Sequence, residues 1–249
     1  MGLGLGQGVS SPSYVNTFQL SDLSSLTAWF KKGEGITTDG GNVSRWVSQV
    51  GDFCFGQNTS GKQPVHDALS DVIQFTSARE LDLGTADFST QNTITSGVNN
   101  AITVCIAMKI NVDNTNVQTQ FQHILGQGDN EKVQMYLAGD FFYIGGSSTI
   151  TMILPSGTFA DDEVALITWV NEGGTNGNGR VFKNANTTQL NDPDTGTTGA
   201  INLTQLGNDG GQSNRGTSSG IIEIAIFNEE LTGSDLQSVL TDITGRIGI

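Results

Sequence analysis

The sequence predicts an all-β protein in which two antiparallel sheets stack as a jelly-roll sandwich and a helix closes the chain. The first observation is composition: 33 of the 249 residues are glycine, and Lys, Glu and Ala are scarce, which suits many short strands joined by turns. The second is a series of short apolar segments separated by turn clusters such as GGTNGNG and NDPDTGTTG. The third is the end of the chain, where the hydrophobic period lengthens from that of a strand to that of a helix.

The first elements come after a glycine-rich start. The segment SDLSSLTAWFKKGEGITTDGGNVSRWVSQVGD at residues 21–52 predicts a short helical turn, a strand around Trp29, a Gly/Asp turn at residues 39–42, and a second strand or turn around Trp46. Trp29, Trp46 and Trp169 all stand in apolar strand contexts, so we expect them in the core.

The clearest strands lie in the middle of the chain. Residues 101–110 place alternate apolar side chains, from Ile102 to Ile110, on one face. Residues 163–171 are apolar on both faces, as expected of an inner strand. The further predicted strands are residues 72–76, 123–126, 133–137, 141–145, 149–154, 179–183 and 201–206.

The end of the chain predicts a strand that leads directly into an amphipathic helix. Ile222, Ile224 and Ile226 alternate with less apolar residues, which is the period of a strand with one face in a core. Thr232, with Asp235 three residues later, suits a helix start, and the helix is predicted over residues 233–246. Its apolar stripe is formed by Leu236, Val239, Leu240 and Ile243.

One domain is expected for residues 21–249, helix included, because no linker rich in Pro or charge divides the middle of the chain. Residues 1–20 form a glycine-rich arm before it. In this arm Leu3, Leu5 and Val9 are spaced by glycine, so the backbone could follow a groove while the apolar side chains enter pockets. We predict that this assembly arm packs either on its own domain or on a neighbouring protein.

Charge and cysteine content exclude several classes of function. Eleven basic and twenty-five acidic residues give a net charge of −14, which repels a phosphate backbone, so no nucleic-acid partner is expected. Cys54 and Cys105 lie in apolar runs and predict buried, unpaired thiols. Two histidines leave little for a metal or acid–base centre. The sequence shows no stretch of membrane-spanning length and no signal peptide, so we expect no membrane partner and synthesis in a cytosol.

Several segments, in order along the chain, resemble the laminin-G-like, concanavalin A-like jelly rolls. They are the opening with its two Trp residues, QPV at 63–65, IQFTSARELDLG at 73–84, ITWVNEGGTNGNGRVFKNAN at 167–186, and the closing strand and helix at 220–249. The resemblance implies a concanavalin A-like sandwich whose last strand returns beside the first. It also implies that the following helix covers an edge or end of a sheet.

The MGLGLG start, joined to such a domain, resembles jelly-roll proteins that tailed bacteriophages of marine bacteria carry in the virus particle. This resemblance implies a non-enzymatic structural protein of the virion, displayed on the capsid or tail and made in the host cytoplasm. Its partners would be other virion proteins, contacted through the arm, and it could be an oligomer.

No catalytic residue is assigned. Glucanase relatives carry an ExDxxE strand motif that presents paired carboxylates, and this sequence has neither that motif nor a GxSxG elbow, a P-loop or an HExxH pair. Glu223, Glu229 and Glu230 form the nearest acidic run, which we interpret as a solvated edge. We expect the protein not to be an enzyme.

Calcium is not expected at the position where many relatives hold it. In that segment Ser77, Ala78 and Arg79 stand where oxygen ligands are needed, and only Glu80 offers a carboxylate. The NDPDTG loop at residues 191–196 resembles half of a calcium loop but lacks the downstream Glu. No cofactor is predicted.

The alternative hypothesis is a carbohydrate-binding module that attaches to host or environmental glycans. An aromatic face with nearby amides and carboxylates could be supplied by FFYIGG at residues 141–146 and by the GQGDNEK and GNDGGQSN segments. The same aromatic residues also fit a strand packed in or on a sheet. The candidate glycan-binding residues are Asp129, Asn130, Tyr143, Asn208 and Asp209.

Overall fold

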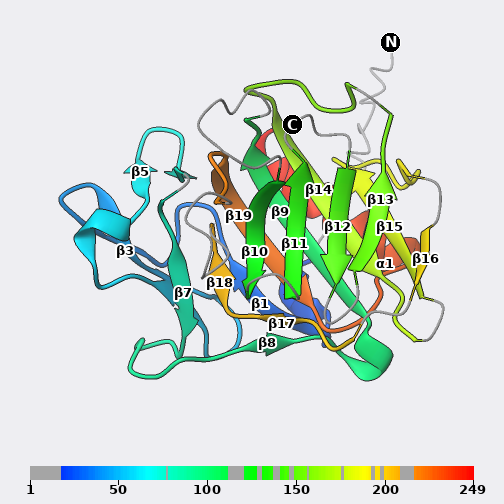
Figure 1. Ribbon diagram of the computed structural model, residues 1–249, viewed down its shortest axis with the longest axis horizontal. Helices are drawn as coiled ribbons and strands as arrows, with labels where there is room; N and C mark the ends of the chain where they lie inside the picture. Colours follow the sequence, from blue (N-terminus) through cyan, green and yellow to red (C-terminus); the bar gives the residue numbers. More distant parts are fainter. Residues whose placement is uncertain are drawn as a thin grey trace, which may run out of the picture.

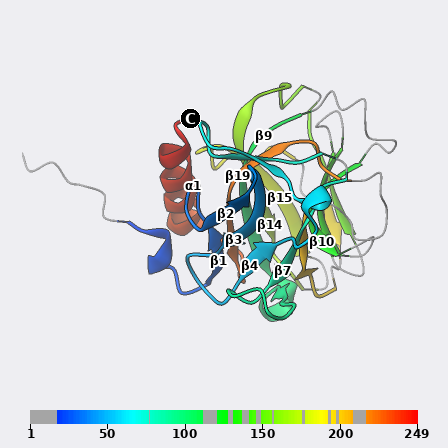
Figure 2. The same ribbon diagram turned by 90° about the vertical axis from the view of Figure 1, so that its left-hand side faces the viewer.

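The computed structural model describes residues 18–76, 78–111, 121–127, 131–136, 141–145, 149–155, 157–174, 177–191, 194–196, 199–207 and 216–249. The predicted arm, with Leu3, Leu5 and Val9, lies outside these residues except for its last three positions. Two β-sheets face each other, and one helix, α1 (Gly233–Ile247), lies against the outer surface of one sheet (Figures 1 and 2). The predicted sandwich with a C-terminal helix is confirmed.

The helix-covered sheet contains the strands that sequence periodicity identified most clearly. Its members, in spatial order, are β1 (Leu26–Phe30), β19 (Gly220–Phe227), β9 (Ile102–Lys109), β14 (Val164–Asn171), β15 (Gly177–Lys183) and β16 (Asp194–Gly196). All neighbours are antiparallel. The last long strand therefore returns beside the first, as predicted.

The facing sheet is built from shorter strands. Its members, in spatial order, are β13 (Thr149–Ile153), β12 (Phe141–Gly145), β11 (Glu131–Tyr136), β10 (Phe121–Gln127), β18 (Gln205–Leu206), β7 (Leu81–Gly84), β4 (Cys54–Gly56), β3 (Asn42–Val47) and β2 (Ile36–Asp39). The strands β5 (Val65–Asp67) and β6 (Val72–Gln74) connect the sheets, because β5 pairs with β3 and β6 pairs with β19. The two sheets thus form one curled surface.

Short elements complete the fold. They are the 3₁₀ turns η1 (Leu20–Asp22), η2 (Ser60–Lys62) and η3 (Val98–Asn100), and the paired strands β8 (Ile94–Thr95) and β17 (Asn202–Leu203). The predicted strand at residues 201–206 is divided into β17 and β18. It breaks at Thr204 because the chain changes partner there, from β8 to β10 and β7. No described helix combines the length and apolar character needed to span a membrane.

Two apolar cores lie on either side of the helix-covered sheet. The inner core, between the sheets, takes Ile102, Val104 and Ile106 from β9, while the outer core, under α1, takes Cys105 and Ala107 from the same strand. β14 divides its side chains in the same way, which explains why it is apolar on both faces. Trp46 and Trp169 belong to the inner core and Trp29 to the outer core, so the predicted burial of all three is confirmed.

The helix packs through the predicted stripe, and Leu236, Val239, Leu240 and Ile243 are all buried in the outer core. The resemblance implied that α1 covers an edge or end of a sheet, and this expectation was wrong. The helix lies on the face made by β14, β9 and β19, because the outward side chains of those strands are themselves apolar (Figure 2). A face of this kind needs a covering element to exclude water.

The prediction for β19 was wrong in one respect. A register shift lies between Ile221 and Glu223 in the pairing with β9. As a result Ile221, Ile224 and Ile226 enter the inner core, whereas Ile222 enters the outer core. Every residue of β19 is buried, so the strand has both faces in a core rather than one.

Candidate functional site

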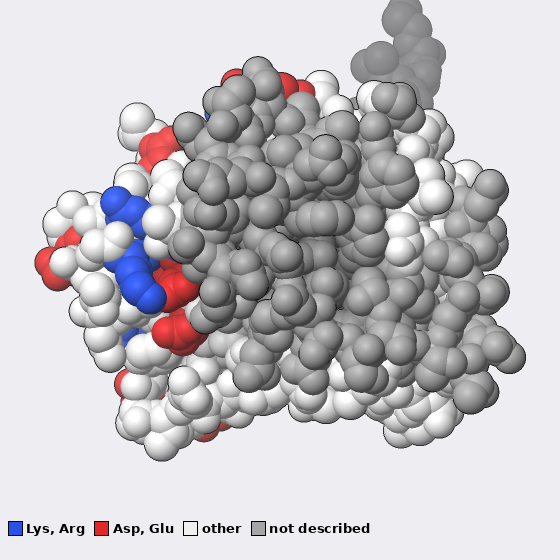
Figure 3. All heavy atoms as spheres, in the orientation of Figure 1, with Lys and Arg blue, Asp and Glu red and all other residues white. Residues whose placement is uncertain are grey.

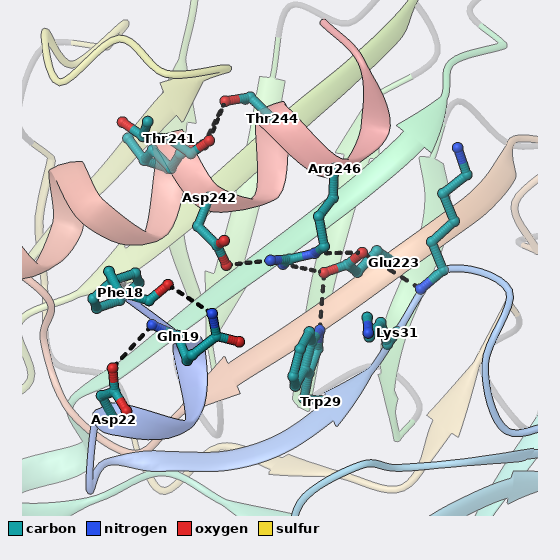
Figure 4. Close-up of polar contacts among 12 residues, drawn as sticks. Phe18, Gln19, Asp22, Trp29, Lys31, Glu223, Thr241, Asp242, Thr244 and Arg246 are labelled. Atoms are coloured by element: carbon teal, nitrogen blue, oxygen red, sulfur yellow. Dashed lines mark hydrogen bonds and ion pairs between the residues drawn. The ribbon is translucent and has the colours of Figure 1, made fainter. Parts of the chain in front are cut away.

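A buried charge cluster lies where α1 ends above β19 and β1 (Figure 4). The Glu223 side chain is 0% exposed, and its Oε1 accepts hydrogen bonds from Arg246 Nη2 at 2.6 Å and from Trp29 Nε1 at 2.9 Å. Arg246 also pairs with Asp242, one helical turn earlier. Its guanidinium carbon lies 5.0 Å from the centre of a Trp29 ring, within cation–π range.

This cluster corrects the interpretation of Glu223 as part of a solvated edge. The strand irregularity beside Ile221 places its carboxylate on the helix side of the sheet, where a cation from α1 balances the charge. Burial alone would lower the pKa of Arg246, but the hydrogen bonds and charges of Glu223 and Asp242 outweigh that effect and raise it. The sequence held a signal for this ion pair: Arg246 stands in the last turn of the predicted helix, and Glu223 is the one glutamate in the apolar strand before it.

The first described residues of the chain lie beside this cluster (Figure 4). Phe18 and Leu23 pack against the outer core, and Leu20 is fully buried in it. The turn η1 is closed by a reciprocal pair of contacts: the Gln19 N–H donates to Asp22 Oδ2 at 2.9 Å, and the Asp22 N–H donates to the Gln19 carbonyl at the same distance. Residue 18 is therefore held firmly on the α1 side of the molecule.

Protein cations lie in the segment where the resemblance would place a calcium site. Arg79 donates from its guanidinium to the Gln63 carbonyl and to Asn42 Oδ1, and Lys62 Nζ lies 2.5 Å from Glu80 Oε1. Figure 3 shows blue and red side chains side by side over this part of the surface, near β3 and β7. Glu80, the one carboxylate assigned to that segment, is thus already neutralised by Lys62. Among the described residues no group of three or more His, Cys, Asp or Glu is arranged to hold a metal ion.

A groove of about 510 Å³ opens on the surface at the other end of α1. It is lined by side chains from β15, from the turn after it, and from the first turn of the helix. The lining residues are Arg180, Phe182, Thr187, Gln189, Thr232, Gly233, Ser234, Leu236 and Gln237. None was singled out as a binding residue from the sequence, because the three segments meet only in the folded chain.

Arg180 is the one cation among these described lining residues. Its guanidinium pairs with Glu230, has a Glu172 oxygen 3.9 Å away, and lies over the ring of Phe182 at 5.8 Å. Thr232 occupies the N-cap position of α1, as predicted, but its hydroxyl makes no capping hydrogen bond. The side chains of Phe182 and Leu236 are almost wholly buried, so they support the groove from below.

The two cysteines are free and buried, Cys54 in β4 and Cys105 in β9. Burial raises the pKa of both thiols, that of Cys105 to about 12. At neutral pH both therefore stay protonated, and a protonated thiol is neither a good nucleophile nor a metal ligand.

The grouping of the predicted glycan-binding residues stays a prediction, because most of them fall outside the part of the chain that the structure describes. Asp129, Asn130, Asn208 and Asp209 lie outside the described residues, and of Tyr143 only the backbone, in the middle of β12, is described. The NDPDTG loop contributes Asn191, which is buried. Its side chain accepts from the Val181 N–H and donates to the Gly179 carbonyl, so it holds the loop against β15.

Comparison with known proteins gives a fold but no family. No protein-family model and no curated protein matches the sequence. Among solved structures, the binding domain of botulinum neurotoxin serotype D matches with a TM-score of 0.52 and 12% identity, over 88% of this chain and 51% of that one. A sialidase of Trypanosoma rangeli matches with a TM-score of 0.49 and 8% identity, over 89% of this chain and 33% of that one.

The chain thus spans about half of the neurotoxin domain and a third of the sialidase. At such low identity the likeness concerns the fold alone. Together with the two curled antiparallel sheets and the closing helix, it shows that this chain has a concanavalin A-like jelly-roll fold.

Proposed function

We propose that this protein is a non-enzymatic structural component of a bacteriophage particle, displayed on its capsid or tail and held there partly by its N-terminal arm. The observation that carries the proposal is the way the chain enters the fold. Phe18, Leu20 and Leu23 fix the root of the arm in the outer core beside α1, so an arm bound to a neighbouring virion protein would hold the domain from that side.

Such an attachment would transmit force from the arm directly to the helix-covered sheet. Three residues separate η1 from β1, and β1 pairs with β19 from Leu26↔Phe227 to Phe30↔Ile224. A pull on residue 18 would therefore act along the edge of the helix-covered sheet. The domain would turn its α1 side towards the particle and its β10–β13 side outwards (Figure 2).

The contacts of the buried carboxylates support the proposal that the protein is not an enzyme. Glu223 is bound by Arg246 and Trp29, and Glu80 is bound by Lys62. Both carboxylates thus stabilise packing contacts between elements. A general acid or nucleophile would instead need to face a substrate.

Glycan binding is the second candidate function, and it is compatible with the first. The groove at the start of α1 favours it, because its hydroxyl and amide side chains surround a volume within the range of roughly 300–1,000 Å³ that is typical of small-molecule sites. A displayed domain could hold the particle with its arm and contact a host or environmental glycan with its surface.

Deletion of residues 1–13 tests the anchoring proposal. The truncated chain should keep its melting temperature within a few degrees, because it retains Phe18, Leu20 and Leu23, which pack the start of the described domain into the outer core. Its incorporation into purified particles should be lost or strongly reduced. Replacing Leu3, Leu5 and Val9 by Ser should have the same effect, whereas Gln7→Ser is the matched control. Full occupancy of the truncated chain on particles would end the proposal, and a large loss of stability would instead indicate an arm bound to its own domain.

A further inference from the structure

We propose that the groove between β15, the turn at residues 184–190 and the first turn of α1 binds an uncharged sugar unit, a neutral hexose of a glycan. The inference rests on the glycan-binding function proposed above and assigns its site and the charge class of its ligand. The site differs from all the candidate residues that the sequence indicated.

The first argument is that the groove contains polar groups with no internal use. The hydroxyls of Thr187, Thr232 and Ser234 line it and make no hydrogen bond with any other described residue. Each hydroxyl can donate once and accept twice. Sugar hydroxyls have the same donor and acceptor capacity, so three free hydroxyls in one groove match a polyhydroxylated ligand better than an apolar one.

The second argument is that the walls of the groove are fixed before a ligand arrives. Gln189 Nε2 donates to the Asn191 carbonyl at 2.7 Å, which holds the amide on the turn. Gln237 Nε2 donates to the Ala185 carbonyl at 3.2 Å, which joins the helix to the same turn. A site whose side chains are already ordered loses less conformational entropy on binding.

The third argument concerns charge and selects the class of sugar. Arg180 is the only cation among the lining residues, and it is already paired with Glu230 and close to Glu172. Asp235, which lies in the first turn of the helix between the lining residues Ser234 and Leu236 in the sequence, adds another negative charge to this turn. An acidic sugar would bring a carboxylate or sulfate towards an excess of negative charge, which costs free energy. A neutral hexose meets no such penalty.

The paired arginine still contributes to recognition of a neutral sugar. Its ion pairs and its contact with the Phe182 ring hold the guanidinium in one orientation. Guanidinium N–H groups donate to sugar oxygens, and the carboxylate of Glu230 accepts from sugar hydroxyls. Two neighbouring hydroxyls of a hexose can therefore bind this ion pair together, one accepting from Arg180 and the other donating to Glu230.

Binding of the full-length chain to a defined panel tests the proposal. The neutral members are glucose-, galactose-, mannose- and N-acetylglucosamine-terminated oligosaccharides, and the acidic members are sialyllactose and oligogalacturonate. Thr187→Tyr fills the groove from the turn, and Ser234→Tyr fills it from the helix. Thr188→Tyr is the matched control, because Thr188 is exposed on the same turn but does not line the groove.

The expected result is binding to at least one neutral glycan that weakens roughly tenfold or more in both groove variants and is unchanged in the control. All three variants should melt at the wild-type temperature. Binding that survives in both groove variants overturns the site while leaving a glycan-binding function in place. Preference for the acidic members overturns the charge argument. Failure of the wild type to bind any member overturns the glycan-binding function together with the site, whereas the anchoring proposal is tested separately by particle incorporation.

Discussion

Replacing Arg246 by Met should destabilise the fold more than any other single change of charge in the described part of the chain. The substitution keeps much of the side-chain volume but leaves the Glu223 carboxylate, which is 0% exposed, without its cation. Removing one partner of a buried pair typically costs about 3–5 kcal/mol. Here Trp29 Nε1 still donates to the carboxylate, and Arg246 itself is 23% exposed, so we expect a loss of about 2–3 kcal/mol.

The opposite substitution should cost less. Glu223→Gln keeps an oxygen that can accept from Trp29, and the arginine that remains is partly hydrated and still paired with Asp242. We expect a loss of about 1 kcal/mol. The double variant with Leu at 223 and Met at 246 should be more stable than Arg246→Met alone, because it leaves no unpaired buried charge.

Urea unfolding followed by tryptophan fluorescence measures these differences, provided that the slope m is unchanged. Lys31→Met is the matched control. The Lys31 ammonium also lies near Trp29, 5.3 Å from the centre of a ring (Figure 4). It pairs with Glu34 rather than with the buried Glu223, so its removal should cost less than about 1 kcal/mol. The reasoning is refuted if Arg246→Met behaves like this control, or if Glu223→Gln is the more damaging of the two.

Three further predictions follow from burial. Leu240→Ala should reduce the free energy of unfolding by about 2–4 kcal/mol, since Leu240 is fully buried under α1; a loss below about 0.5 kcal/mol, typical of a surface site, would contradict the packing. Cys54 and Cys105 should resist a thiol reagent in the folded protein, react after unfolding, and show no mass gain on reduction; a gain of two daltons, one per hydrogen, would indicate a disulfide. Burial raises the pKa of Asp82, so the ionised carboxylate opposes folding when the pH is above that pKa. Asp82→Asn should therefore raise the melting temperature near pH 7, and this gain should fade as the pH drops through the pKa of Asp82. A gain in melting temperature that does not depend on pH would exclude this cause.

Much of the fold could be predicted because its longest strands carry a clear hydrophobic period. The alternation in residues 101–110 assigned Ile102 and Ile106 to one face, and the inner core contains both. The continuous apolar run at residues 163–171 indicated a strand buried on two faces, which β14 is. The helical stripe of α1 was predicted residue by residue. In each case one local period decides which side of the element loses contact with water.

The remaining features depend on contacts between distant segments. A single irregularity in β19 places Glu223 on the side of Arg246, and sequence alternation cannot show where a strand gains an extra residue. The groove needs Thr187, Thr232 and Gln237 to meet, which only the packing of α1 beside β15 achieves. Strands as short as β8 contain two residues, too few for any period to appear.

The position of β19 has a consequence for how the protein is made. This strand follows every other described strand in the sequence, yet it lies between β1 and β9 and pairs with both. A nascent chain that still lacks residues 220–227 would expose an unpaired edge of β1 and an unpaired edge of β9. It would also expose apolar side chains that are buried in the two cores of the complete protein. Final assembly must therefore wait until these residues have left the ribosome. Premature termination anywhere before Phe227 should give a product that aggregates rather than a smaller folded domain.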